Sequence, residues 1–506
     1  MADARLLRIH PADNVAVSVQ SLTAGTLADA AGEAVEVRQD VPAGHKVALA
    51  DLAAGSTIVK YGFPIGVLTT DVTKGSWIHG DQLKTRLEGE IEYSFRNGVR
   101  DATSPKDAPT FMGYRRKNGR AGTRNEIWII NTVGCVNHAA ERIAKIAAER
   151  FAQHASERFA GRIDGIHSFS HPYGCSQLGD DLQNTQRVLA GMLRHPNAGG
   201  VLVLGLGCEN NQMSALLAQA GDVDEERLRF FNTQEVIDEV DEGLNAIESL
   251  VAAMEKDERV ECPASDLVLG MKCGGSDGFS GITANPLVGR ISDRVTELGG
   301  TAILTEVPEM FGAEQVLMDR AANEEVFDGI VRMVNEFKDY FIRHNQPIYE
   351  NPSPGNKAGG LTTLEEKSLG AIQKGGHATV TDVLSYGEPV TKSGLALLQA
   401  PGNDAVSSTA MVASGATVLL FTTGRGTPLG FPVPTVKISS NSEIAERKPH
   451  WIDFNAGALL DGTADLNDLS EKLFKYVLDV ASGRELTNNE KHGYREIAIW
   501  KEGVTL

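Results

Sequence analysis

The sequence predicts a multidomain protein in which a small all-β N-terminal domain precedes an α/β body with mostly parallel, Rossmann-like sheets. Three observations lead to this prediction. The chain has 506 residues, enough for two to four domains of roughly 100–200 residues each. Short apolar runs separated by Gly- or Asp-containing turns fill residues 1–95. From residue 111 onward, apolar β runs alternate with helical patterns, which is typical of right-handed βαβ units.

The composition is that of an acidic protein, with 48 Lys and Arg against 67 Asp and Glu and a net charge of −19. This balance offers no basic surface for phosphate backbones or anionic lipids, so we expect neither nucleic-acid nor membrane partners. The first residues lack the pattern of a signal peptide, and no apolar run approaches the ~18 residues of a membrane span. We therefore expect a cytoplasmic protein. A small-molecule substrate is the expected partner, and an acidic metabolic enzyme of this size is expected to be a homo-oligomer.

The β domain is expected over residues 1–95, as a small all-β module of short strands. The segments with strand patterns are 6–10, 14–19, 34–41, 45–52, 56–62 and 64–72. Residues 96–110 contain two prolines and have no apolar periodicity, which predicts a linker.

The α/β body is expected as two subdomains, 111–260 and 261–506. In the first, the predicted strands are 126–133, 163–170 and 199–207, and the helices are 138–155, 178–195 and 210–220. In the second, the predicted strands are 265–271, 300–307, 395–400, 416–426 and 434–440, and the helices are 285–299, 324–343, 405–414 and 466–481. Residues 350–360 are rich in Pro, Gly and Asn and are predicted to be irregular, either a linker or a functional loop.

The five cysteines indicate thiols or metal ligands rather than disulfide bonds, because their number is odd and they are spread over a long chain. Cys262 precedes a strand and is interpreted as structural. The other four follow predicted strands, where ligands of a doubly wound sheet bind: Cys135, Cys175, Cys208 and Cys273. Thiolates converging from several loops suit iron or an iron–sulfur cluster, whereas small buried cysteines in tight loops are the alternative.

Three polar loops are suited to an anionic substrate, although each on its own is also compatible with a structural turn. Residues 272–281 place backbone N–H groups and hydroxyls ahead of a helix. Residues 351–357 and 423–428 each contribute one cation, Lys357 and Arg425. Arg425 can bind a carboxylate in a bidentate manner, and Lys357 can act as a point charge or, if desolvated, as a base.

Long glycine-rich motifs occur together between residues 111 and 457. They are GYRRKNGRAGTRNE, TVGCVN, GLGCE, CGGSDGFSGITANP, NPSPGNKAGG and FTTGRGTP. With these motifs the chain resembles the altronate/galactarate dehydratase family, and more the altronate branch than the galactarate branch. The N-terminal IHPADNVAV, GHKVAL and IVKYGFPIG look like the SAF-type β-clip domain that precedes the catalytic region in this family. The resemblance implies removal of water from a sugar acid to give a 2-keto-3-deoxy acid, with ferrous iron or another divalent metal.

One segment departs from the family pattern. Altronate-branch members tend to carry a closely spaced His pair before an Asn, whereas this chain has His79 followed by Asp81 and Gln82. If that pair binds metal or moves protons, a carboxylate has replaced an imidazole. The exact sugar acid and the metal therefore stay open at this point.

Removal of a proton next to a carboxylate requires an electrophilic site that stabilises the ene-diolate and an acid that assists departure of the 3-hydroxyl. The expected catalytic residues are His171 or Lys357 as the base and His79 as the acid. The expected substrate-binding residues are Gly274, Gly275, Ser276, Asp277, Asn356, Arg425 and Thr427.

The expected metal ligands are Cys175, Cys208 and Cys273, with Glu209 as an oxygen alternative. Ferrous iron is the expected cofactor, and Mn²⁺, Mg²⁺, Ca²⁺ or an iron–sulfur cluster are the alternatives.

The reaction that the resemblance implies is the dehydration of D-altronate to 2-dehydro-3-deoxy-D-gluconate. A galactarate dehydratase, a lyase that expels sulfite from a sulfo-acid, and a sugar-acid sensor without catalysis are the alternatives. A nicotinamide oxidoreductase is disfavoured because Asn210 occupies the third glycine position of the dinucleotide fingerprint in GLGCEN.

Overall fold

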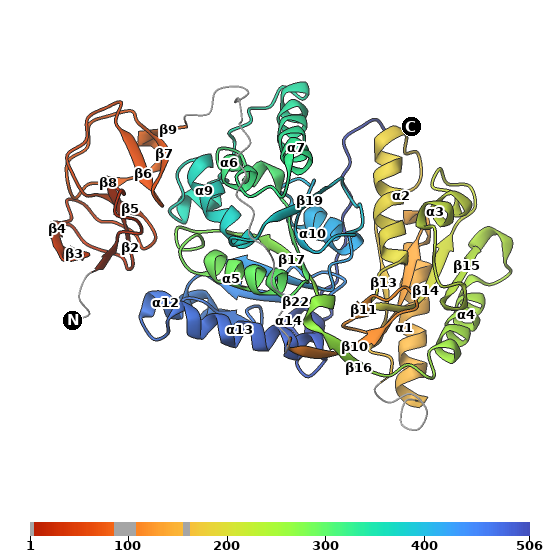
Figure 1. Cartoon of the computed structure of the whole chain (residues 1–506). Helices are drawn as coiled ribbons and strands as arrows, with labels where there is room; N and C mark the ends of the chain where they lie inside the picture. Colours follow the sequence, from red (N-terminus) through yellow and green to blue (C-terminus); the bar gives the residue numbers. More distant parts are fainter. Residues whose placement is uncertain (1–4, 86–107, 155–161) are drawn as a thin grey trace.

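The computed structural model describes residues 5–85, 108–154 and 162–506 (Figure 1). A β-rich module lies at one end of the molecule, a seven-stranded sheet with its helices lies in the middle, and a four-stranded sheet with its helices lies at the other end (Figure 1). The predicted fold class, an all-β domain followed by an α/β body with parallel sheets, is confirmed. The predicted linker, 96–110, falls outside the described residues except at 108–110.

The N-terminal module consists of short strands joined by tight turns. Its strands are β1 (Arg5–Leu7), β2 (Val15–Ser18), β3 (Leu27–Ala30), β4 (Glu33–Glu36), β5 (Lys46–Ala48), β6 (Thr57–Lys60), β7 (Phe63–Leu68), β8 (Trp77–Ile78) and β9 (Leu83–Lys84). Six of them form a sheet in the order β4-β3-β1-β2-β5-β8, and β6, β7 and β9 form a second one. Small apolar residues such as Val35 and Val47 form a core within the six-stranded sheet and its turns.

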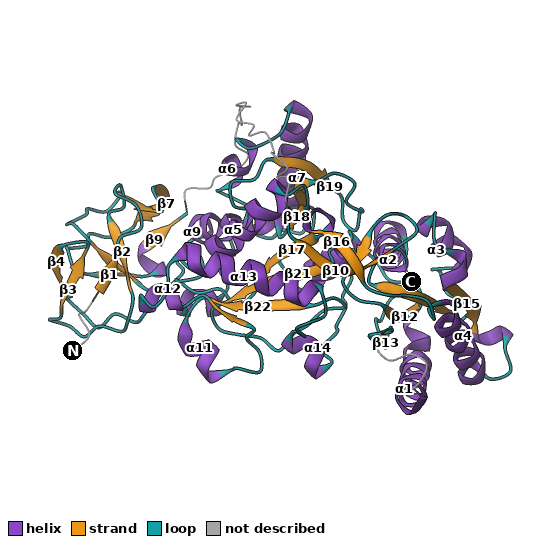
Figure 2. Cartoon of the chain, turned by 60° about the horizontal axis from the view of Figure 1, so that its bottom comes forward, coloured by secondary structure: helices purple, strands orange, loops and turns teal. Residues whose placement is uncertain are grey.

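The first α/β unit contains a parallel sheet in the order β13-β12-β14-β15. Its elements are β12 (Glu126–Asn131), α1 (Asn137–His154), β13 (Gly165–Phe169), α2 (Gly179–Leu193), β14 (Ala198–Gly205), α3 (Met213–Ala220), β15 (Leu228–Asn232) and α4 (Glu239–Ala253). The two central strands, β12 and β14, are buried almost throughout because helices cover both faces of the sheet (Figure 2). Every predicted strand and helix of this unit is present.

A small antiparallel sheet connects the two units. It is formed by β10 (Thr110–Arg115), β11 (Ala121–Gly122) and β16 (Val260–Pro263) in the order β11-β10-β16. The basic motif at 113–126 holds this junction: buried Arg124 forms two hydrogen bonds to the carboxylate of Glu490, at 2.6 and 3.0 Å. Most of the cations in this motif therefore serve the fold.

The second α/β unit has a seven-stranded parallel sheet in the order β19-β20-β18-β17-β21-β22-β23. Its strands are β17 (Val268–Cys273), β18 (Thr301–Leu304), β19 (Val380–Leu384), β20 (Gly394–Leu398), β21 (Val418–Thr423), β22 (Thr435–Ser439) and β23 (Phe454–Asn455). Its helices are α5 (Ala284–Glu297), α6 (Glu314–Met318), α7 (Glu324–Arg343), α8 (Pro354–Ala358), α9 (Leu364–Ala371), α10 (Asp404–Ala413), α11 (Ser442–Arg447), α12 (Ala458–Asp461), α13 (Leu466–Ala481) and α14 (Asn488–His492).

One prediction for this unit was wrong. Residues 350–360 were expected to be irregular, but Pro354–Ala358 form the short helix α8, because Ser353 caps its N-terminus and Pro354 suits the first helical position. No helix among the described residues is both long and apolar enough to cross a bilayer.

The N-terminal module packs against the second α/β unit through buried charges and close backbone contact. Lys46 and Lys60 of the module both contact the carboxylate of Glu366 on α9, at 2.8 and 2.7 Å, and all three side chains are fully buried. Gly44, Gly278 and Gly360 bring three backbone segments together at the same place, where a Cβ on Gly278 or Gly360 would collide with the carbonyl of Gly44. The module is therefore fixed directly beside the loop that follows β17.

The C-terminal tail returns to the first α/β unit. The carboxylate of Asp181 accepts hydrogen bonds from the N–H groups of Glu502 and Gly503, at 2.7 and 2.8 Å. The N–H of Leu506 donates to Ser176 O at 3.0 Å. The tail thus connects the two α/β units at the loop that follows β13.

Candidate active site

Three loops that the sequence predicts to bind substrate meet at the carboxyl end of the seven-stranded sheet. The carbonyl of Gly275 accepts hydrogen bonds from the N–H groups of Gly424 and Arg425, at 3.1 and 3.0 Å. The side chain of Asn356 donates to Ser276 O at 2.9 Å. Neighbouring parallel strands β17 and β21 end at this edge, which is where ligands bind in α/β sheets.

Asp277 is the carboxylate at the centre of these loops. It accepts hydrogen bonds from the hydroxyls of Ser280 and Ser440, both at 2.8 Å, and from the side chain of Asn441 at 3.0 Å. Burial raises the pKa of Asp277 above its ordinary value, although these hydrogen bonds oppose the shift. The carboxylate is thus held in one orientation.

A pocket of about 390 Å³ opens at this junction. It is lined by Val19, Ala43, Asp277, Phe279, Gly359, Gly424, Arg425, Asn441, Ser442, Glu443, Ile444, Arg447, Leu460 and Asp461. The lining comes from the module, from the loops after β17 and β21, from Gly359 at the C-terminal end of α8, and from α11 and α12. The pocket contains two guanidinium groups, which suits an anionic substrate.

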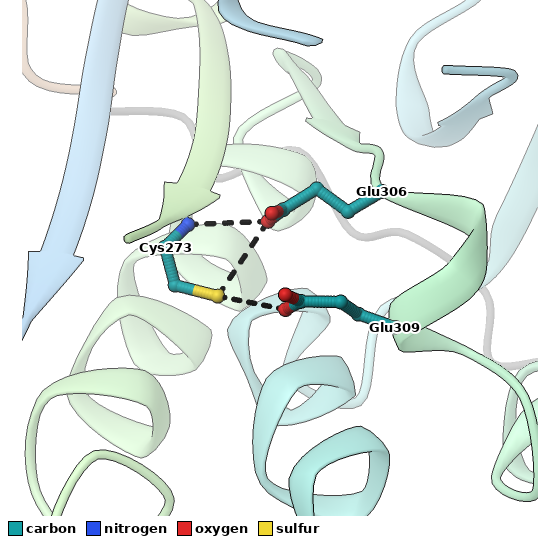
Figure 3. A group of neighbouring side chains, drawn as sticks. All are labelled: Cys273, Glu306 and Glu309. Atoms are coloured by element: carbon teal, nitrogen blue, oxygen red, sulfur yellow. Dashed lines mark hydrogen bonds between the residues drawn. The ribbon is translucent and has the colours of Figure 1, made fainter. Parts of the chain in front are cut away.

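A second group of ionisable side chains lies under these loops, at the end of β17 (Figure 3). The Cys273 thiol lies 3.0 Å from Oε2 of Glu309 and 3.5 Å from Oε2 of Glu306, and the backbone N–H of Cys273 donates to the same oxygen of Glu306 at 3.2 Å. Among the described residues, this is the set of three metal-ligating side chains whose ligand atoms all lie within 4.8 Å of one another. All three are buried.

Lysine side chains already contact the sulfur and carboxylate oxygens that would bind a metal ion. Lys374 Nζ lies 2.8 Å from Cys273 Sγ and 3.2 Å from Oε2 of Glu306, and Lys367 Nζ lies 2.8 Å from Oε1 of Glu309. Lys272 contacts both Glu306 and Asp404. Three ammonium groups therefore balance the three carboxylates without a metal ion.

The pKa values of Cys273 and Glu309 agree with this balance between ammonium groups and carboxylates. Burial, together with the two glutamates, raises the pKa of Cys273 to about 12, so the sulfur carries a proton near neutrality. Burial alone would raise the pKa of Glu309, but Lys367, Lys374 and Lys272 outweigh it and lower the pKa to about 2. A thiol and two carboxylates are suitable donors for ferrous iron, but a divalent ion would have to displace ammonium groups from each of them. The Cys273 group is therefore a poor fit for a resident iron ion.

This buried group is connected to the pocket through one side chain. Lys367 Nζ contacts Oδ1 of Asn356 at 3.1 Å and Oδ1 of Asn351 at 2.8 Å, besides Glu309. Asn356 in turn holds the carbonyl of Ser276. The charges under the sheet edge thereby fix the position of the loops that line the pocket.

The sequence analysis did not single out Glu306, Glu309 or the lysines. A signal was present, because Glu306 lies at the end of the predicted strand 300–307 and Glu309 follows it, at the same edge as Cys273. Glu306 also adopts a left-handed conformation with φ of 70°, which is uncommon for a residue with a side chain and is frequent at functional sites.

The other predicted catalytic residues near the pocket are Lys357 and His79. Lys357 is exposed on α8, between Gly355, whose carbonyl accepts a hydrogen bond from Arg425 at 2.8 Å, and Gly359, which lines the pocket. His79 follows β8 of the module, packs against Trp77 with the two rings tilted and their centroids 5.2 Å apart, and contacts the exposed Asp81 at 3.5 Å. The Trp77 indole donates to His45, which contacts Ala358 O at the end of α8.

His171 lies elsewhere, after β13 of the four-stranded sheet. Its Nδ1 accepts the N–H of Tyr173 at 3.2 Å, so Nε2 carries the proton and donates to Asn131 O at 2.8 Å. Burial lowers the pKa of His171. Both ring nitrogens therefore stabilise the local backbone, and the structure does not bring this residue to the pocket.

The predicted oxygen and sulfur ligands of the first unit are also separate from the Cys273 group. Glu209 is buried, and its carboxylate accepts hydrogen bonds from the N–H groups of Leu206 and Gly207, at 3.0 and 2.6 Å. Cys175 and Cys208 are exposed in the loops after β13 and β14. Cys262 is buried in β16, in agreement with a structural role.

Of the seven predicted substrate-binding residues, Asp277 and Arg425 line the pocket. The other five are not among its lining residues: Gly274, Gly275, Ser276, Asn356 and Thr427. Two of these hold the loops through backbone contacts. The N–H of Gly274 donates to Thr422 O at 3.0 Å. The hydroxyl of Thr427 accepts the N–H of Leu429 at 3.2 Å, which shapes the turn that follows Arg425.

Comparisons with known proteins agree with this architecture. The chain matches the models of three domain families: the altronate/galactarate dehydratase SAF domain at residues 4–86, the second domain of D-galactarate dehydratase/altronate hydrolase at 113–255, and the C-terminal domain of D-galactarate/altronate dehydratase at 264–505. Together these matches cover most of the described residues.

Full-length relatives give the same result. The altronate dehydratases of Bacillus subtilis (strain 168) and Escherichia coli (strain K12) are each 50% identical to this chain, over 99% of this chain and 99% of their own. The galactarate dehydratase (L-threo-forming) of Escherichia coli (strain K12) is 35% identical over 98% of this chain and 96% of its own. The resemblance that the sequence motifs indicate is thus confirmed, and the chain belongs to the D-galactarate/altronate dehydratase family.

Proposed function

We propose that this protein is a hydro-lyase that converts D-altronate to 2-dehydro-3-deoxy-D-gluconate. The observation that carries the proposal is the pocket beside Asp277, where Arg425 and Arg447 offer two cations in a protein of net charge −19. A carboxylate needs such a local positive site in an acidic protein. The two relatives at 50% identity over nearly their whole length are named altronate dehydratases.

The substrate carboxylate is proposed to bind Arg425 and the backbone N–H groups of Gly275 and Ser276. Arg425 is anchored on the Gly355 carbonyl at 2.8 Å, so its guanidinium is held in place and has further N–H groups for a ligand. Asp277 and Asn356 then fix the shape of these loops, Asp277 at the pocket wall and Asn356 behind it.

The proton transfers are proposed to involve Lys357 and His79. Lys357 projects from the helix that borders the pocket and removes the proton next to the carboxylate. His79 of the module acts as the general acid and gives a proton to the departing 3-hydroxyl. The Trp77–His45 contact to Ala358 brings this part of the module to the same helix end. His171 has no place in this proposal.

Iron is the metal that we propose for the enzyme. When bound, it supplies an electrophile for the developing negative charge or for the departing hydroxyl. Since lysines already neutralise the Cys273 group, the steps above depend only on the side chains at the pocket.

One observation favours a second candidate substrate, galactarate. Arg447 is a second cation in the pocket and suits a sugar acid that has a carboxylate at each end. Glu443 partly neutralises it, however, with Oε1 3.2 Å from Nη1 of Arg447. This ion pair favours altronate, whose far end is uncharged.

The test is turnover of the purified full chain under anaerobic conditions, with ferrous iron, on D-altronate, D-galactarate and sulfolactate in parallel. We expect a 2-keto-3-deoxy acid from D-altronate at the highest kcat/KM. Preferred turnover of galactarate, or sulfite release from sulfolactate, would replace the altronate assignment. Binding of all three acids without any product would overturn the proposal that the chain is an enzyme of this kind.

A further inference from the structure

Three of the five cysteines are exposed, and all three lie at the same edge of the four-stranded sheet. Cys135 follows β12, Cys175 follows β13 and Cys208 follows β14, and these strands are direct neighbours in the order β13-β12-β14. Cysteine is normally among the most buried residues, as Cys262 and Cys273 are here. Three exposed thiols at the ends of three adjacent strands are therefore unusual.

Direct hydrogen bonds connect the three loops. The N–H of Gly134 donates to Tyr173 O at 2.9 Å, which joins the Cys135 loop to the Cys175 loop. The N–H of Ser176 donates to Oδ1 of Asn210 at 2.8 Å, and the N–H of Asn211 donates to Gly174 O at 3.0 Å. Each of these bonds is formed within three residues of a cysteine. The three loops thus form one continuous rim, defined by the exposed residues Cys135, Cys175 and Cys208.

The rim also contains the N-termini of three helices. In Figure 1, α1, α2 and α3 follow their strands in this unit, and they begin at Asn137, Gly179 and Met213, two to five residues after the cysteines. The residues that precede α2 and α3 provide no side-chain hydrogen bond to cap them. Helix N-termini stabilise negative charge, so the rim is suited to an anionic ligand group.

The separation of the sulfurs distinguishes two kinds of metal site. Sulfurs that share one tetrahedral ion lie about 3.8 Å apart, given metal–sulfur bonds of about 2.3 Å. The three sulfurs do not form a group within 4.8 Å of one another among the described residues. A four-iron cluster requires wider spacing, because each thiolate binds a different iron.

We propose that Cys135, Cys175 and Cys208 bind an iron–sulfur cluster of the four-iron, four-sulfide type. In binding, each thiol displaces one small thiolate from an iron of a preformed cluster and gives its proton to that thiolate, so one iron–sulfur bond forms, one breaks, and no oxidation state changes. Three thiolates leave one iron without a protein sulfur. This site lies apart from the Cys273 group, and it does not depend on altronate being the substrate.

The test is cluster content of the full chain, purified anaerobically and incubated with a preformed four-iron, four-sulfide cluster that carries small thiolate ligands. We expect about four iron and four sulfide ions per chain and a visible iron–sulfur absorption band. Cys135→Ser, Cys175→Ser and Cys208→Ser should each lose most of the band and sulfide. Cys262→Ser, a cysteine outside the rim, is the matched control and should keep both.

Two results would overturn the proposal: reconstituted chain without sulfide or colour, or colour that survives in the three rim variants and is lost in Cys273→Ser. Circular dichroism of each variant shows whether it is folded, and electron paramagnetic resonance of the reduced wild-type chain identifies the cluster independently of activity. A chain that keeps the cluster but does not turn over D-altronate would contradict the proposed function and leave the cluster assignment intact.

Discussion

Lys46 and Glu366 form a fully buried ion pair, with Nζ 2.8 Å from Oε2, although 320 positions separate them in the chain. Glu366 also contacts Lys60 at 2.7 Å, so one carboxylate compensates two ammonium groups at the boundary between the module and the body. Burial alone would raise the pKa of Glu366, but Lys46 and Lys60 outweigh it and hold the pKa far below the ordinary range. The pocket beside this boundary depends on that arrangement.

The substitution Glu366→Gln should lower the free energy of unfolding by about 3–5 kcal/mol, because it leaves two buried ammonium groups without a counter-charge. Denaturant titration followed by fluorescence measures the change. Glu471→Gln is the matched control: its exposed pair with Arg294 should contribute less than about 1 kcal/mol. Equal effects of the two substitutions would show that the buried carboxylate has no special role.

The substitution Lys46→Met should change how stability depends on pH. Burial, assisted by Lys60, lowers the pKa of Lys46 to about 8, against about 10.4 in an unfolded chain. Between pH 8 and 10 the folded wild type has released this proton while the unfolded chain still binds it, so stability rises with pH by up to about 3 kcal/mol relative to the variant. Denaturant unfolding of both proteins at pH 8 and pH 10 measures the difference. A difference in free energy of unfolding between wild type and variant that is the same at both pH values would refute this prediction.

The substitution Arg425→Ala should raise KM for altronate by about 10–100-fold, because the carboxylate loses a charged hydrogen-bond donor. Arg425→Lys should recover part of the loss, since a lysine keeps the charge but not the bidentate geometry. Steady-state kinetics measure both. Arg484→Ala, which removes an exposed cation paired with Asp479, is the control. An unchanged KM in Arg425→Ala would remove this residue from the binding site.

The substitution Glu443→Gln should raise kcat/KM for galactarate relative to altronate by about 2–5-fold, because it releases Arg447 from an exposed ion pair. Competition between the two acids in one assay measures the ratio. The double variant Glu443→Gln/Arg447→Gln should lose the gain. A ratio that stays constant in both variants would show that the far end of the substrate does not meet Arg447.

Alkylation should separate the cysteines into two classes. In chain stripped of metal, iodoacetamide at pH 8 should label Cys135, Cys175 and Cys208 rapidly, because these side chains are exposed. Cys273 should stay unlabelled until unfolding, because burial raises its pKa to about 12. Peptide mass spectrometry identifies the sites, and Cys262 serves as the second buried reference. Labelling of Cys273 at the rate of Cys135 would contradict its burial.

Amphipathic helices and buried strands were predictable from local pattern. The bounds of α7 and α13 agree with the predicted 324–343 and 466–481, because apolar stripes define each helix and Asn323 and Asp465 cap their N-termini. β3 was not predicted, because its alternating pattern exposes Leu27 and buries only alanines.

The site was predictable only where its residues follow strands in the sequence. The loops of Asp277 and Arg425 were found because strand ends position ligands, and the structure brings them together. The pairing of Lys367 with Glu309, and of Lys46 with Glu366, has no sequence signal, because only the packing of distant elements places those charges next to each other.

The position of the C-terminal tail matters for handling the protein. Leu506 is held at Ser176, next to Cys175, whereas β1 lies at the opposite end of the molecule (Figure 1). A polyhistidine tag fused after Leu506 would place imidazoles beside the thiols, where nickel from an affinity column would compete with iron for the rim. Tagging in front of the module avoids this, so metal contents are to be compared on protein purified that way.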